Sequence, residues 1–205
     1  MVALDYTRDG KPAKALPLFQ EAALGIEKRR FQHEHAGKIV SNLIDCLEQL
    51  RQFDQAEPWR RKWLPEVKER AGAESPLYTH ELAALGHNLL LQKKWIDAEP
   101  VLRECLTVRE KKTPDEWTTF HAKSMLGAAL LFQKKYAAAE PLLLAGYEGM
   151  KQRELQFPQQ SKILLIEAAR RLILLYDALG KPDEAVKWGR VLAQTKDPAK
   201  QPPKR

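Results

Sequence analysis

The sequence predicts an all-α protein built as a solenoid of repeated helix-turn-helix units. A tripeptide, Ala-Glu-Pro, recurs at residues 56–58, 98–100 and 139–141, which are 42 and 41 residues apart. Between these marks, apolar residues return every three to four positions, the period of an α-helix. No segment between turn signals alternates apolar and polar residues as a strand does. A fixed period near 42 residues, with two helices in each period, is typical of a stacked helical repeat.

The repeat can be followed through five registers. A degenerate copy, Ala15-Leu16-Pro17, stands 41 residues before Ala56, and Ala185 stands 46 residues after Ala139. An aromatic residue precedes each of the three central alanines by three positions. These registers predict a single array over residues 1–195, followed by a basic, Pro-rich tail at 196–205 that we expect to be flexible. The predicted units are 1–35, which is partial, 36–75, 76–113, 114–157 and 158–195.

Local signals predict where the helices begin and end. Ser75-Pro76 combines an N-cap serine with proline at the first helical position, and Thr113-Pro114 repeats this signal with a glutamate three residues after the cap. Gly10-Lys11-Pro12 and Gly180-Lys181-Pro182 are expected to end one helix and begin the next. Extra residues near 155–158 offset the fifth register, which predicts a variant, capping unit there.

Several residues are expected in the core. Gly127 and Ala139 should meet where the two helices of one unit cross, because small side chains allow a close approach. Cys46 and Cys105 fall on the buried phase of their helices. Most tryptophans are expected to be buried as well. Trp59 and Trp63, which flank Arg60-Arg61-Lys62, leave open the alternative of an exposed basic and aromatic patch.

The composition excludes several classes of protein. The chain carries a net charge of +7, but its last eleven residues hold four basic residues and one acidic residue, so a net +3 lies in the tail. This distribution disfavours a nucleic-acid-binding stripe. No apolar run approaches the roughly 18 residues that span a bilayer, and residues 1–10 lack a secretory signal. Two cysteines make no disulfide framework, so we expect a cytoplasmic protein without membrane contacts.

The sequence offers no catalytic or metal-binding motif. It contains no Gly-rich phosphate loop, no nucleophile elbow and no cysteine and histidine motif, which predicts a protein that is not an enzyme and needs no cofactor. His80 and His87 are seven residues apart, or about 10 Å along a helix, too far to hold one ion without a third element. His33-Glu34-His35 lacks the spacing of a zinc protease motif. We therefore expect no metal site.

The pattern Leu-Gly, Leu, aromatic-x-x-Ala, Leu resembles the tetratricopeptide repeat (TPR) family. Leu85-Gly86 and Leu126-Gly127 each lie twelve residues before an anchor alanine. The long period and the Ala-Glu-Pro-x-Leu stretch look like the kinesin-light-chain variety. The resemblance covers residues 1–195. It implies a right-handed superhelix in which the first helix of each pair lines a concave groove. It also implies a non-catalytic scaffold that binds a peptide segment or a partner domain in that groove.

Helical phase places a set of polar residues on the expected inner face. Asn42 stands where kinesin-light-chain-like arrays often carry an asparagine that bonds a peptide backbone, but Ala84 and Met125 replace it in the next two units. The two-lysine, two-asparagine clamp that some TPR domains use for a terminal carboxylate is not assembled here. Each residue taken singly could also be solvated surface. The candidate groove residues are Lys38, Asn42, Asp45, His80, His87, His121, Ser124 and Arg170.

A second resemblance suggests an alternative function. Residues 139–149 and 179–188 look like the TPR tails of bacterial eukaryotic-type Ser/Thr kinases. The first unit has only about nine residues for its first helix, which suggests a chain that continues upstream of Met1. The alternative is therefore a regulatory tail of a larger bacterial kinase. The sequence does not identify the partner.

Overall fold

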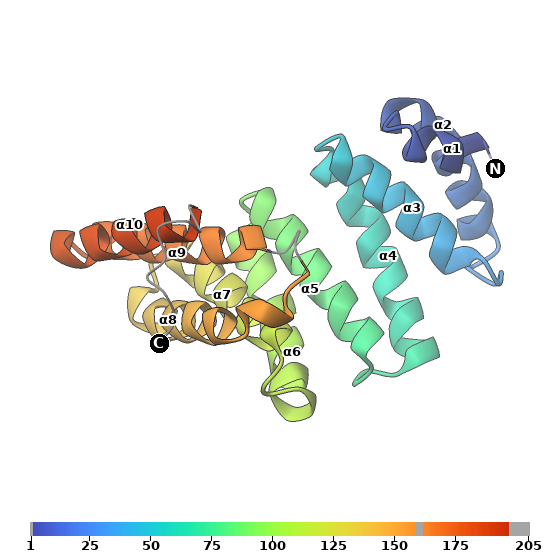
Figure 1. Ribbon diagram of the computed structural model, residues 1–205. Coiled ribbons are helices and arrows are strands. Elements are labelled where there is room, and N and C mark those ends of the chain that lie inside the picture. The colour runs from blue at the N-terminus through green and yellow to red at the C-terminus, as the bar shows by residue number, and fades with distance from the viewer. Residues whose placement is uncertain (1, 159–161, 197–205) are drawn as a thin grey trace. The chain divides into compact units, whose positions relative to one another are not determined.

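The computed structural model describes residues 2–158 and 162–196, and within these ranges it contains ten α-helices, one short 3₁₀ helix and no strand (Figure 1). The all-α prediction is confirmed. The predicted tail, apart from the backbone of residue 196, lies outside the described residues. The chain divides into two compact units, Met1–Lys93 and Lys94–Arg205, here called unit 1 and unit 2.

Unit 1 contains five helices, each packed on the next along the chain. Ala15 and Ala56, two of the register alanines, are fully buried there, and Leu43, Ile44 and Leu47 on α3 are large, almost fully buried residues of the same unit. The helices are α1 (Val2–Arg8), α2 (Pro12–Lys28), α3 (Ala36–Gln49), α4 (Phe53–Ala71) and α5 (Pro76–Leu91).

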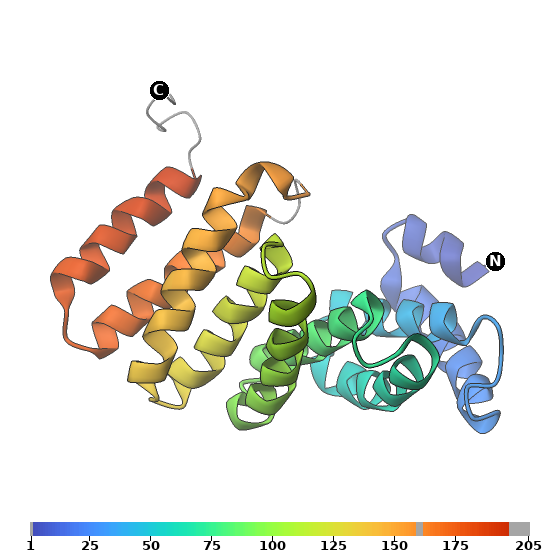
Figure 2. The same ribbon diagram turned by 90° about the horizontal axis from the view of Figure 1, so that it is seen from below.

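Unit 2 contains the other five helices, and each again packs on the next (Figure 2). Ala98 and Ala139 are fully buried, and Ala185 is nearly so. Cys105 is buried, as is Cys46 in unit 1, which confirms both predictions. The helices are α6 (Trp95–Lys112), α7 (Trp117–Phe132), α8 (Tyr136–Gln152), α9 (Ile163–Ala178) and α10 (Pro182–Lys196), with the 3₁₀ helix η1 (Glu154–Gln156) after α8.

The turn inside each helix pair places one residue in the left-handed backbone region. Gly10 and Gly180 have φ values of 69° and 64°, which confirms the two predicted glycine turns. Arg51, Lys93 and Lys134 take the same place with φ values of 58°, 61° and 61°. Glycine adopts this conformation freely, whereas for a residue with a Cβ it costs about 1–2 kcal/mol. The three central turns therefore carry strain that the outer two avoid.

The two predicted N-caps have opposite outcomes. Ser75 Oγ accepts a hydrogen bond from the Tyr78 amide at 3.1 Å, and α5 begins at Pro76 as expected. The prediction at Thr113 was wrong, because α7 begins at Trp117 and residues 114–116 form a turn. The Thr113 amide donates to the last turn of α6, at Arg109 O, 2.7 Å away. Its carbonyl accepts the Thr119 hydroxyl at 2.6 Å. These bonds hold Thr113 as the end of α6.

The glutamate of each Ala-Glu-Pro tripeptide bonds to the first helix of the next pair. Glu57 Oε2 accepts from Gln92 Nε2, and Glu99 Oε2 accepts from Gln133 Nε2, both at 2.9 Å. Each glutamine also donates to the carbonyl of the residue that starts the glutamate's own helix, at 3.2 Å and 3.1 Å. Glu140 Oε1 accepts from Tyr176 Oη at 3.0 Å instead. We call the contact made by each of these three glutamates the Glu clasp. It joins α4 to α5 in unit 1, and α6 to α7 and α8 to α9 in unit 2.

The Glu99 clasp should make the stability of unit 2 depend on pH. Hydrogen bonds from Lys135, Arg103 and Gln133 outweigh burial and lower the pKa of Glu99 to about 2. A lowered pKa stabilises the fold above the unfolded value near 4.5, and this stability is lost as the pH falls toward 2.

We therefore expect Glu99→Gln to lower the free energy of unfolding by about 1.5–3 kcal/mol at pH 7, measured by urea titration. The difference from the parent chain should shrink as the pH falls from 4.5 to 2. Glu148→Gln, at an exposed position on α8, serves as the control. An equal loss at pH 7 and near pH 2 would contradict an ionic clasp.

Glycines let α7 and α8 approach closely. A Cβ on Gly127 would lie 2.7 Å from Leu143 Cγ, so the nearest neighbour of this glycine is one turn beyond the expected Ala139. A Cβ on Gly146 would lie 2.7 Å from the backbone nitrogen of Ser124. A Cβ on Gly149 would overlap the Phe120 ring. The sequence analysis did not single out Gly146 or Gly149, although together they set how closely α8 packs on α7.

Gly149→Ala should therefore destabilise unit 2 by about 1–3 kcal/mol, because the added methyl group overpacks against an aromatic ring. Gly189→Ala on α10 is the matched control, since nothing lies within 4 Å of the new methyl group. The free energy of unfolding of the control should rise by about 0.5–1 kcal/mol, because alanine has a higher helix propensity than glycine. Chemical denaturation measures both variants. A higher free energy of unfolding in both would contradict the close packing of α8 on α7, because the helices could then separate at no cost.

Candidate functional site

An ion network lies between the first helices of unit 1 and is centred on Arg60 of α4. Arg60 Nε and Nη2 donate to the two carboxylate oxygens of Glu48 on α3, at 2.8 Å and 2.9 Å. Arg60 Nη1 donates to Glu81 Oε2 on α5 at 3.4 Å. Asn88 Nδ2, also from α5, donates to Glu48 Oε1 at 2.9 Å. The side chain of Arg60 is 10% exposed, and its guanidinium links α3 and α5. We call these four residues the Arg60 network.

The carboxylates of this region are not equally compensated. Burial acts to raise the pKa of Glu48, but hydrogen bonds from Arg60 and Asn88 overcome it and lower the net pKa. Burial raises the pKa of Glu81, and the Arg60 charge opposes this only in part. Burial likewise raises the pKa of Asp45 at the edge of the network, against the opposing charges of Arg60 and His80. Three carboxylates thus share one guanidinium.

The structure brings three of the predicted groove residues to the Arg60 network. Asp45 and His80 are exposed, and His87 is half-buried. The charge of His80 acts on Asp45 and that of His87 on Glu48, so all three border the network. Lys38 is exposed and Asn42 half-buried, and both lie on α3 with Asp45.

The sequence analysis missed the network itself, although the repeat carries a signal for it. Arg60 stands four residues after its register alanine, where Leu102 and Leu143 are fully buried. Glu48 likewise replaces a buried leucine, and Asn88 replaces a buried alanine or cysteine, in the other registers. A polar residue at a register position that is apolar elsewhere marks each of them. The equivalents are Leu90 and Leu131 for Glu48, and Cys46 and Ala129 for Asn88.

Removal of Arg60 alone should be costly. Arg60→Leu leaves Glu48 and Glu81 buried without their cation, and breaking such a pair costs about 3–5 kcal/mol. A second variant adopts the residues of the other registers at every network position (Glu48→Leu, Arg60→Leu, Glu81→Ala, Asn88→Ala). Its free energy of unfolding should lie within about 1 kcal/mol of that of the parent chain, or above it. Urea titration at pH 7 measures both. If the four-residue variant were as unstable as Arg60→Leu, the network would be a packing requirement rather than a dispensable polar feature.

In unit 2 the predicted groove residues differ in their exposure and do not form one cluster. Ser124 is fully buried against Gly146, so it cannot contact a ligand, contrary to its expected place in a groove. His121 is half-buried beside the Trp117 ring, with centroids 6.4 Å apart. Arg170 is exposed. The neighbouring residue, Arg171, is the one that reaches α7, where its Nη1 donates to Ser124 Oγ at 2.9 Å.

The alternative of an exposed basic and aromatic patch at residues 59–63 holds only in part, because Arg61 and Lys62 are exposed and Trp59 is half-buried. Trp63 is buried. Arg61 Nε donates to Glu57 at 2.8 Å, and Lys62 pairs with Glu27 at 2.6 Å while lying over the Trp59 ring. With Arg60 buried as well, these cations are engaged within unit 1.

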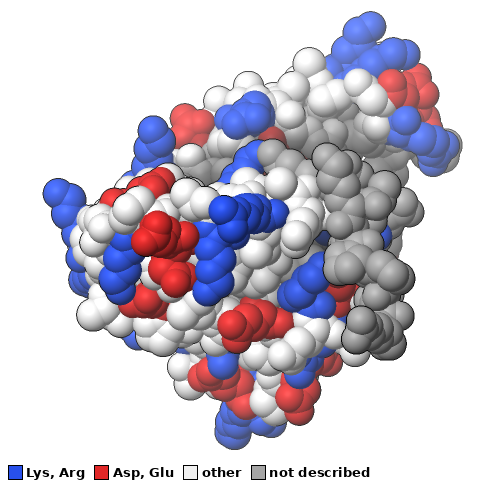
Figure 3. Space-filling model, turned by 60° about the vertical axis from the view of Figure 1, so that its left-hand side comes forward, with Lys and Arg blue, Asp and Glu red and all other residues white. Residues whose placement is uncertain are grey.

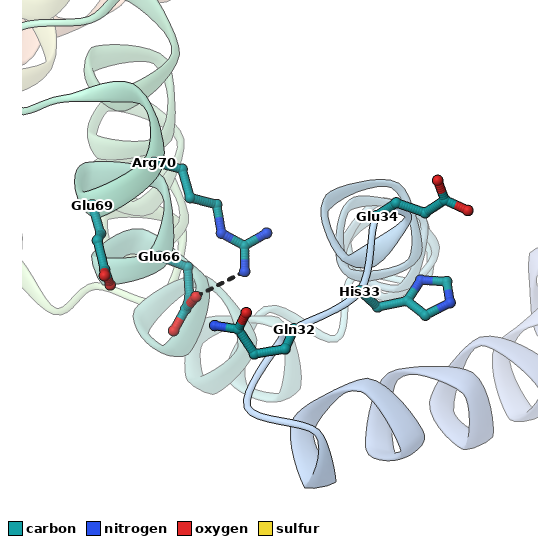
Figure 4. A pocket seen from close by; sticks show the side chains of 6 residues that line it. All are labelled: Gln32, His33, Glu34, Glu66, Glu69 and Arg70. Carbon is teal, nitrogen blue, oxygen red and sulfur yellow. Dashed lines mark hydrogen bonds and ion pairs between the residues drawn. The ribbon is translucent and has the colours of Figure 1, made fainter.

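A polar hollow in unit 1 lies between the α2–α3 loop and the end of α4 (Figure 4). Arg70 pairs with Glu66 at 3.0 Å and donates to Phe31 O at 2.7 Å. In Figure 4, Gln32 points toward this pair, whereas His33 and Glu34 point away from it. The lining side chains therefore do not converge on one point. They are Gln32, His33, Glu34, Glu66, Glu69 and Arg70.

Surface charge, helix hydrophobicity and the placement of potential metal ligands bear on the class of protein. On the face shown in Figure 3, basic and acidic side chains are interspersed rather than separated. No helix in the described part of the chain is long and apolar enough to cross a membrane. Residues 2–158 and 162–196 contain no group of three or more potential metal ligands placed to hold an ion.

The helix pairs define this chain as an all-α helical-repeat solenoid. Its backbone is similar to solved TPR-like proteins. Nearly identical TPR-like repeats of the kinesin light chain type from Podosopora anserina match with a TM-score of 0.71 and 14% identity, over 98% of this chain and 94% of that chain. BtubC (BKLC) from P. vanneervenii matches with a TM-score of 0.73 and 16% identity, over 99% and 81%. MamA (41-end) from Desulfovibrio magneticus RS-1 matches with a TM-score of 0.67 and 15% identity, over 98% and 94%.

The particular fold is therefore that of TPR-like repeats, including the kinesin-light-chain-like kind, as the repeat pattern predicts. No protein-family model and no curated protein matches this sequence. At these identities the similarity describes the fold.

Proposed function

We propose that this chain is a non-catalytic scaffold that binds a peptide segment or a partner domain on the first-helix face. Each unit has such a face of its own, made by α3 and α5 in unit 1 and by α7 and α9 in unit 2. The candidate contact residues are those that remain accessible in the structure: Lys38, Asn42, Asp45, His80, His87, His121 and Arg170.

The Arg60 network is the observation that carries this proposal. Buried ion pairs contribute little to stability compared with well-packed apolar residues. The repeat accommodates leucine at two of these positions in the other registers, so packing alone does not require charge there. Contact with a partner on this face would explain why the charged residues of the Arg60 network stand beside the exposed Asp45 and His80. TPR-like arrays generally use such faces to bind proteins.

Site-specific photo-crosslinking tests the proposal. A benzoylphenylalanine residue placed at position 38 or 80, both exposed on first helices, should crosslink to a discrete partner in the cells that express the chain. The same residue at Lys28 or Gln55, exposed on second helices α2 and α4, is the matched control and should give none. Excess unlabelled chain should suppress the crosslinked product.

Crosslinks from positions 28 and 55 but not from 38 and 80 would overturn the assignment of the face. Crosslinks from none of the four positions would overturn the scaffold function itself. The variant with four network substitutions adds an independent readout. It should remain folded, and the crosslink from position 38 should weaken, because the charges beside that face are gone.

A further inference from the structure

Arg171 holds a nearly buried guanidinium with more donors than acceptors. Its side chain is 13% exposed. Its described partners are Ser124 Oγ, 2.9 Å from Nη1, and Glu167 Oε2, 3.4 Å from Nη2. A guanidinium carries five N–H donors, so most of this capacity is not used by the two contacts.

The comparison with Arg60 shows how unusual this arrangement is. Arg60 is held by both oxygens of one carboxylate at 2.8 Å and 2.9 Å and by a second carboxylate. Arg171 has one neutral hydroxyl and one long contact with Glu167, whose side chain is 34% exposed. Burial lowers the pKa of Arg171, and the nearby Glu167 charge opposes this only in part. The charge is therefore largely desolvated, with a single part-exposed counter-ion at 3.4 Å, which costs free energy.

Packing does not explain why arginine stands at this position. In the preceding registers the equivalent residues are Met125, which is fully buried, Ala84 and Asn42. None of the three is charged, so the repeat does not require a charge at this place. Ser124, fixed against Gly146, instead holds the guanidinium at the side of α7.

We infer that Arg171 binds a carboxylate group of an acidic partner segment on the first-helix face of unit 2. The inference rests on the proposed function and adds the chemistry of the partner. Planar guanidinium and carboxylate groups pair through two parallel hydrogen bonds, which would fill donors that are now unused. Glu167 marks the side from which a carboxylate can approach, because it is the part-exposed acidic neighbour. Its negative charge also favours a singly charged carboxylate over a doubly charged phosphate.

Fluorescence anisotropy with a labelled, C-terminally amidated octa-glutamate peptide tests this inference on the full chain. Arg171→Gln should weaken binding of the peptide by about tenfold or more. Arg190→Gln removes the same charge from an exposed position on the second helix α10 and should change the affinity by less than about twofold. Glu167→Gln should tighten binding, because it removes the competing carboxylate. An octa-lysine peptide should not respond to any of these substitutions.

Equal losses in the Arg171 and Arg190 variants would overturn the inference, since binding would then reflect net charge alone. Tighter binding of an octapeptide with two phosphoserines would overturn the carboxylate assignment. Arg171→Met provides a check on folding, because it should unfold at the same urea concentration as the parent chain or a higher one. A marked loss of stability in that variant would assign Arg171 a structural role instead. First-helix crosslinks that persist while these binding results fail would leave the proposed function standing.

Discussion

The carboxylate of the Ala-Glu-Pro tripeptide makes the contact that ties α4 to α5 in unit 1, and α6 to α7 and α8 to α9 in unit 2. The alanine is buried, the proline faces solvent, and the glutamate reaches the first helix of the next pair. Three adjacent residues thus serve the core, the surface and the neighbouring pair. In unit 2 the second clasp changes its donor from Gln133 to Tyr176, but the acceptor stays a glutamate. The tripeptide recurs at three successive interfaces, whereas the interface of α2 with α3 has Leu16 at the place of the glutamate.

The candidate contacts with a partner fall where the repeat breaks its own pattern. Apolar residues fill the register positions of Arg60 and Arg171 in neighbouring pairs, and both arginines are mostly buried. They differ in what surrounds them. Arg60 is compensated within unit 1 by carboxylates from two helices, whereas Arg171 is compensated weakly. A buried charge that its own fold does not satisfy is a candidate for contact with another molecule.

Local sequence signals succeeded where the preceding helix did not compete for the same residue. Ser75 and Thr113 carry the same cap-then-proline signal, yet Ser75 caps α5 and Thr113 does not cap α7. The amide of Thr113 is bonded to the end of α6, and its carbonyl accepts a hydroxyl from the start of α7. A capping rule considers the following turn alone, so it cannot anticipate that the preceding helix already holds the residue.

The sequence by itself determined the all-α class, the helix-turn-helix period, the glycine turns and the buried register alanines. These features repeat along the chain or depend on neighbouring residues, so one sequence displays them. The tertiary structure decided which polar residues on the first helices can be reached. Ser124 proved to be buried and Arg171, rather than Arg170, bonds to α7. Successive helical residues differ by about 100° in direction, so a shift of one position moves a side chain from solvent to a neighbouring helix. The neighbour that it then meets comes from a distant part of the sequence.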